Sequence, residues 1–151
     1  MARFSGQLLG STPSTGVANW VLETVANVEA QVLEFSWGGE LTTSTAMRTR
    51  ISRDSAVGTG SRTAGNTQKI NNHSPAATAF FSTTYATLQP TINNGALWGT
   101  SWNAHGGVVR WLAAPGEEMD LYDASAANAS LECRADVGTG TSSYNVIWQE
   151  I

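Results

Sequence analysis

The stretch from Gly106 to Tyr122 reads GGVVRWLAAPGEEMDLY and shows the strand-and-turn pattern of the chain most clearly. After its Pro-Gly pair, apolar and polar residues alternate with a period of two, which is typical of a strand with one buried face. Pro115 and Gly116 predict a type II turn, because proline fixes φ and glycine accepts the positive φ that follows. Before the turn both strand faces are apolar. We therefore expect a central strand, or one that a partner covers on its second side, together with a buried Trp111 and an antiparallel pair across the turn.

The composition of the 151-residue chain is typical of a single domain that carries little charge. Charged residues make up 13% of the chain, the net charge is −4, and Lys69 is the only lysine, so we expect no nucleic-acid partner. The sequence has no apolar run of the ~18 residues that a transmembrane helix needs and no signal-peptide pattern, so we expect no membrane partner. Cys133 alternates with apolar residues, which predicts a buried thiol.

Strand-like patterns recur along the chain and predict an all-β fold. They occupy residues 27–37, 46–53, 78–87, 96–104, 129–137 and 144–151. With the opening stretch they indicate about eight or nine short antiparallel strands in a β-sandwich or jelly-roll-like fold. A change of apolar face within 27–37 predicts a bulge or burial on both sides. Residues 19–26 have a spacing that is also compatible with one short helix.

Two polar segments stand apart from these strands. We expect residues 1–14 to form an N-terminal arm or an edge strand, and residues 15–151 to form the sandwich domain. Residues 54–75 are rich in Gly, Ser, Thr and Asn and predict a long polar loop, a kind of segment that is often functional or disordered. By contrast, residues 144–151 stay apolar to the last position, which predicts a strand docked inside a sheet.

The residues that usually carry catalysis show no supporting pattern. His73 and His105 lack a partner at metal-ligand spacing, and no G-x-S-x-G sequence is present. The acidic residues at 117–123 lack the order of a calcium-binding loop. We therefore expect no enzyme activity, no metal and no cofactor. Two alternatives stay open: a glycoside hydrolase built from two carboxylates, and glycan binding by Trp98 and Trp102, which lie four residues apart on one strand face.

Arginines are the better candidates for partner binding. Arg48 and Arg50 alternate with Met47 and Ile51, so both arginines should project from the polar face of one strand. Arginine is favoured in protein contacts because its planar fork pairs with a carboxylate at two points. The same pattern is equally typical of an ordinary solvated strand face. The candidate partner-binding residues are Arg48, Arg50, Arg53, Arg3 and Phe4.

Several segments together resemble small virion proteins of tailed bacteriophages, some of which are head decoration (cement) proteins. The segments are WGGE at 37–40, TSTAMRTR at 43–50, Arg110-Trp111 with Pro115-Gly116-Glu117, and VIWQE at 146–150. Cement proteins of this size are commonly β-sandwich or tulip-like folds that trimerise at three-fold positions of a capsid. The likeness covers most of the chain, but its motifs are loose.

This resemblance implies a non-enzymatic structural protein. It would be made in the cytoplasm of a bacterial host, lie on the capsid surface of the virion, and bridge capsid subunits as an oligomer. The implied partners are the major capsid protein of a phage head and further copies of the chain, as a homotrimer. A tail or neck component, or a receptor-binding β-sandwich that uses surface tryptophans, is the alternative function.

Overall fold

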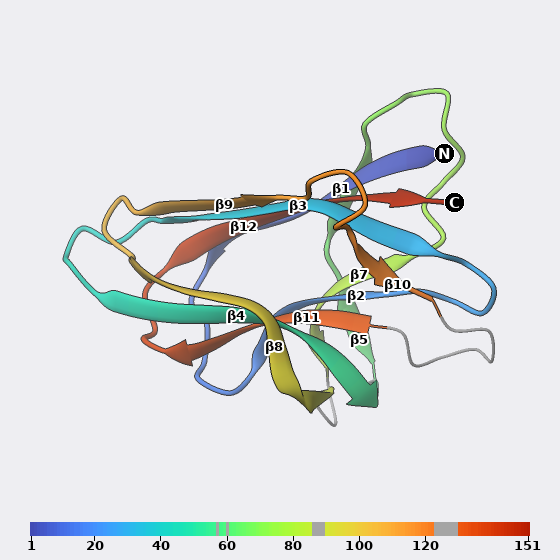
Figure 1. The fold of residues 1–151 in the computed structure, drawn as a ribbon. Coiled ribbons are helices and arrows are strands. Elements are labelled where there is room, and N and C mark those ends of the chain that lie inside the picture. Colours follow the sequence, from blue (N-terminus) through green and yellow to red (C-terminus); the bar gives the residue numbers. More distant parts are fainter. Residues whose placement is uncertain (57, 60, 86–89, 123–129) are drawn as a thin grey trace.

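A computed structural model describes residues 1–56, 58–59, 61–85, 90–122 and 130–151, which form a β-sandwich of two six-stranded antiparallel sheets (Figure 1). The described residues contain twelve strands, more than the eight or nine expected, and none of them is helical. The strands are β1 (Ala2–Ser11), β2 (Ala18–Glu23), β3 (Ala30–Gly39), β4 (Ala46–Ala56), β5 (Arg62–Ala64), β6 (Asn66–Lys69), β7 (Phe80–Tyr85), β8 (Thr91–Asn103), β9 (Val108–Leu112), β10 (Met119–Leu121), β11 (Ser130–Val137) and β12 (Ser142–Glu150).

The two sheets lie face to face, and every strand pair in them is antiparallel. Sheet A has the order β10-β3-β12-β1-β6, with β9 also paired to β3. Sheet B has the order β5-β7-β2-β11-β4-β8. In Figure 1 sheet A is the upper layer, and both chain ends lie at the same end of the sandwich. No helix long and apolar enough to cross a membrane is found in the part of the chain that the structure describes.

The turn at Pro115-Gly116 forms as predicted, but it does not reverse the chain. Glu117 N–H donates to the Ala114 carbonyl at 2.9 Å, and Gly116 has a φ of +88°, as a type II turn requires. β9 and β10 then pair with successive parts of the same edge of β3 and run in one direction. The expected antiparallel pair across the turn is therefore wrong. Residues 113–118 connect two strands that lie one after the other along the same edge of β3 in sheet A.

β9 is an edge strand, so the expected central strand is wrong, and the alternative of a strand covered by a partner stays a prediction. Its only strand partner among the described residues is β3, and Val108 and Leu112 on its outer face are 78% and 61% exposed. Trp111 on the inner face is half-buried, which is less than predicted. Val108 and Leu112, with Arg110 between them, therefore meet solvent in the single chain.

Residues 18–23 form strand β2, so the short helix that the spacing at 19–26 allowed does not form. β2 lies between β7 and β11, and all six of its residues are buried. Trp20 and Leu22 point into the main core, whereas Ala18 and Val21 form a separate buried pair. A strand that is buried on both faces has no apolar-polar alternation, and this is why its sequence was compatible with a helix.

Two further boundary predictions are corrected. Residues 2–11 form β1, which pairs with β12 on one side and β6 on the other, so they are neither an arm nor an edge strand. The segment 54–75 is not a structureless loop, because β4 extends to Ala56 and the segment contains β5 and β6. These two short strands border sheet B and sheet A respectively and close one side of the sandwich.

The predictions for β3 and for the end of the chain are confirmed. Leu33 is an extra residue in β3, because Val32 pairs with Trp148 and Glu34 pairs with Ile147, which is a β-bulge. β12 lies between β1 and β3 in the middle of sheet A. Cys133 is fully buried, as predicted.

Aromatic rings fill the core between the sheets. Phe35 stacks on Trp37 and Trp111 with ring centroids 5.4 and 4.8 Å apart, and the edge of Trp98 meets it at 5.0 Å. Phe4 and Trp148 pack 5.7 Å apart towards the other end. Large aromatic side chains thus join the two layers along the length of the sandwich.

Candidate interaction surface

Arg48 and Arg50 lie on the outer face of sheet B, as their spacing predicted. Met47, Thr49 and Ile51 alternate with them along β4 and are buried against the inside of the sandwich. The side chains of Arg48 and Arg50 are 57% and 30% exposed. The strand therefore presents both guanidinium groups on one outward face.

One carboxylate serves both arginines. Asp136 of β11 has its oxygens 3.7 Å from Arg48 Nε and 3.1 Å from Arg50 Nε. Two positive groups and one negative group leave one net positive charge among these three side chains. Since the Arg48 side chain is more than half exposed, its guanidinium group can donate hydrogen bonds to a further carboxylate from a partner.

A shallow hollow of about 360 Å³ lies beside this pair. Its wall includes Arg48, Arg50 and Asp136, and small residues of β8 complete it, namely Ala96, Gly99, Thr100 and Ser101. Gly99 is directly opposite Arg50 in the β4–β8 register, so no side chain there blocks the approach of a partner backbone. This surface combines open space with an available positive charge, and we refer to Arg48, Arg50, Asp136, Gly99 and Ser101 as the arginine surface.

A buried network of charged groups continues along the same face. Arg134 Nη2 donates to Glu132 Oε2 at 2.7 Å and to the Pro90 carbonyl at 3.1 Å, and all three residues are buried. Ser130 Oγ donates to Asp54 Oδ2 at 2.7 Å. Cross-strand pairs on β4 and β11 therefore carry polar side chains that are shielded from water on the outer side of the sheet.

Asp54 and Glu132 form a carboxyl pair within this network. The two groups lie within hydrogen-bonding reach of each other, and Asp54 Oδ1 and Glu132 Oε1 have no donor among the described residues. Burial raises the pKa of Asp54 from 3.8 to about 7, and the Ser130 hydroxyl offsets only part of this rise. Burial also raises the pKa of Glu132, against the opposing effect of Arg134. We expect one proton, shared between the two groups, to supply the missing donor.

Three of the five predicted partner-binding residues lie elsewhere. Arg53 donates to the backbone and side chain of Asp120 on β10, so it ties sheet B to sheet A. Phe4 is fully buried in the core and cannot contact a partner, which corrects that prediction. Arg3 is exposed on β1, which belongs to sheet A, whereas Arg48 and Arg50 lie on β4 in sheet B.

Trp98 and Trp102 face the interior and do not form the stacking platform that glycan binding would need. Both are half-buried and pack against the core, where Trp98 contacts Phe35 and Trp37. Trp102 Nε1 donates to Thr49 Oγ1 at 3.0 Å. Both rings are thus partly enclosed by the protein itself.

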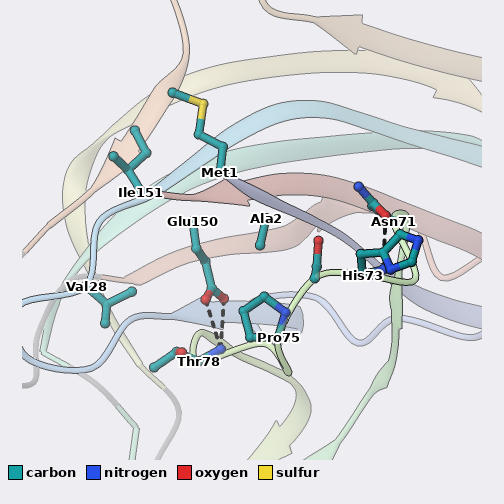
Figure 2. A pocket seen from close by; sticks show the side chains of 10 residues that line it. Met1, Ala2, Val28, Asn71, His73, Pro75, Thr78, Glu150 and Ile151 are labelled. Atoms are coloured by element: carbon teal, nitrogen blue, oxygen red, sulfur yellow. Dashed lines mark hydrogen bonds between the residues drawn. The ribbon is translucent and has the colours of Figure 1, made fainter.

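A second hollow, of about 460 Å³, lies where the two chain ends meet (Figure 2). The Glu150 carboxylate accepts hydrogen bonds from the backbone N–H groups of Thr78 and Ala79. These bonds hold the loop between β6 and β7 against β12. His73 N–H donates to Asn71 Oδ1 within that loop. The contacts at this hollow hold the fold together.

The histidines and acidic residues are dispersed. His105 lies in the β8–β9 turn, where its Nδ1 is 2.8 Å from the Leu41 carbonyl oxygen. Among the residues that the structure describes, no three His, Cys, Asp or Glu side chains gather as a metal site would require. Of the acidic residues at 117–123, Asp123 lies outside the described part of the chain.

Sequence reasoning missed the buried Asp54–Glu132 pair, because it placed Asp54 at the start of a loop. The alternation of β11 contained a signal, since Glu132 and Arg134 occupy the face opposite Leu131 and Cys133. Comparison with known proteins finds no family model, no curated protein and no solved structure that matches the chain.

Proposed function

We propose that this chain is a non-enzymatic structural protein of a phage virion, which decorates the head and stabilises it by bridging capsid subunits. The observation that carries the binding role is the outward pair Arg48 and Arg50, which share one carboxylate beside an open hollow. The location on a phage head rests on the resemblance of the segments at 37–40, 43–50, 110–111 with 115–117, and 146–150.

The arginine surface suits a carboxylate on the capsid. A partner Asp or Glu can meet the Arg48 fork at two points, and the small side chains at Gly99 and Ser101 let its backbone approach. A contact of this kind becomes strong when docking removes it from water. Loss of one member of a buried, hydrogen-bonded ion pair then costs about 2–5 kcal/mol of binding free energy.

The test mixes the purified protein with expanded heads that were assembled without it. We expect saturable co-sedimentation at a fixed ratio to the major capsid protein and a raised melting temperature of the heads. The double variant Arg48→Ala/Arg50→Ala should bind at least about 30-fold more weakly, as the loss of ~2 kcal/mol or more implies. Arg3→Ala is the matched control, because Arg3 is an exposed arginine of the other sheet and should leave binding unchanged.

The same assay separates the alternatives. Binding to purified tails or to host glycans, without binding to heads, would assign the protein to the tail, neck or receptor-binding class. Equal weakening by Arg3→Ala and by the double variant would show that general positive charge, rather than the arginine surface, drives the association.

A further inference from the structure

Strand β8 leaves one side of sheet B open. It is the last strand in the sheet order, and β4 is its only strand partner among the described residues. Natural edge strands are commonly protected by lysine, proline, inward charges, bulges or shortness. β8 spans thirteen residues and contains no charged residue and no proline. Its register shifts against β4 all lie before Trp98, so the free backbone N–H and C=O groups of residues 98–103 form a regular, unprotected edge for another strand.

The interior of the sandwich is also incompletely covered on this side. β9, which follows β8, borders sheet A, so both sheets have an edge here. The half-buried rings of Trp98 and Trp111 both contact Phe35 at this opening. Leu97, which has no direct partner in β4, is 44% exposed. A strand added to β8 would cover apolar surface as well as backbone groups.

The sequence of β8 is nearly symmetric about Thr100. The five residues at 98–102 read WGTSW, with a tryptophan two positions away on each side and a small residue next to Thr100 on each side. Trp98, Thr100 and Trp102 face inward, opposite Ile51, Thr49 and Met47 of β4, while Gly99 and Ser101 face outward. An edge with this symmetry is complementary to itself when two copies run antiparallel.

We propose that β8 is a self-association edge, at which a second copy of the chain pairs antiparallel with Thr100 on the two-fold axis. This register places Trp98 of each copy opposite Trp102 of the other, and Gly99 opposite Ser101. Cross-strand aromatic pairs of this kind stabilise sheets. No like charges meet within the paired strands, because β8 has none. Sheet B becomes continuous across the two copies.

A two-fold edge closes as a dimer, since the same surface is used by both copies. The inference therefore differs from the trimer that the phage resemblance implies. The dimer would also carry two arginine surfaces on one continuous sheet face. The self-association itself does not depend on the proposed function, because it needs no capsid.

The first test measures the mass of the full chain by sedimentation equilibrium from micromolar to millimolar concentration. We expect a reversible dimer, and Ser101→Lys should weaken it by about tenfold or more, because lysine at an edge opposes strand addition. Ser101 is exposed, so the folded single chain tolerates this change. Ser61→Lys is the matched control, because Ser61 is exposed beside β5 at the opposite border of sheet B and should leave the dimer intact.

The second test identifies the register. Thr100→Cys should give a covalent dimer under mild oxidation, because opposite residues across a two-fold antiparallel pair lie within disulfide reach. Cys133 is fully buried and should not react in the folded chain, and Ser61→Cys serves as the control. A purely monomeric chain, a trimer, a dimer that Ser101→Lys leaves unchanged, or a dimer that Thr100→Cys fails to cross-link would each overturn the proposal.

Discussion

The sharpest prediction from the structure concerns the carboxyl pair of Asp54 and Glu132. In the change Asp54→Asn, the new amide can donate to Glu132 Oε1 while its oxygen still accepts from Ser130 Oγ. The amide therefore replaces the shared proton with a donor that does not titrate. Glu132 keeps its ion pair with Arg134, and Arg50 also favours its ionised form.

The sign and size of the effect follow from the pKa of Asp54. The folded chain raises this pKa from 3.8 to about 7, so between these values the folded state holds a proton that the unfolded state has lost. The stabilisation is complete below pH 4, falls as the pH rises towards 7, and is absent above it. About three pH units at ~1.4 kcal/mol each give a loss on the order of 4 kcal/mol. Asp54→Asn should avoid this loss.

The assay is urea denaturation at a series of pH values from 4 to 8. Wild type and Asp54→Asn should have similar free energies of unfolding near pH 4, and the variant should be more stable by several kcal/mol at pH 8. Asp54→Ala is the control for the donor, because it removes the titrating group but leaves Glu132 Oε1 without a hydrogen bond. It should be about 1–3 kcal/mol less stable than Asp54→Asn at every pH. Parallel pH profiles of wild type and Asp54→Asn would refute the shared proton.

Three other predictions concern the fold. Trp111→Ala should lower the free energy of unfolding by about 3 kcal/mol, at the lower end for aromatic truncations because Trp111 is half-buried on Phe35, and a loss below ~1 kcal/mol would contradict this packing. Gly39→Ala should cost about 1–3 kcal/mol, because its Cβ would collide with the Ala104 carbonyl, whereas Gly95→Ala has open space and should change stability by less than ~0.5 kcal/mol in thermal melts. Far-UV circular dichroism should show a β-dominated spectrum, and a helical one would contradict the sandwich.

The fold class could be predicted from sequence because alternation is a local property. β3 and β12 each bury alternate residues, and even the bulge at Leu33 was visible as a change of apolar face. The type II turn was likewise fixed by its own proline and glycine. What followed the turn was not local: whether β10 folds back on β9 or continues along β3 depends on the free edge of β3, which the residues of the turn do not encode.

The candidate surface could be predicted in part for the same reason. Arg48 and Arg50 were placed correctly from their alternation with buried residues of β4. The same alternation places Phe4 on the inner face with Gly6 and Leu8. The prediction of an N-terminal arm obscured this pattern. The partner of Asp54 could not be found locally, since Ser130 lies 76 residues further along the chain and meets it only when β4 and β11 pair.

Electron cryo-microscopy can show whether the protein docks on a phage head through the arginine surface, as we propose. Expanded heads are imaged with saturating wild-type protein and with the Arg48→Ala/Arg50→Ala variant. With the wild-type protein we expect sandwich-shaped density at regular lattice positions, with the outer face of sheet B against the capsid and an acidic capsid residue at Arg48. Weak or absent density is predicted for the variant. Bare heads with the wild-type protein, or density in which sheet A faces the capsid, would contradict the claim.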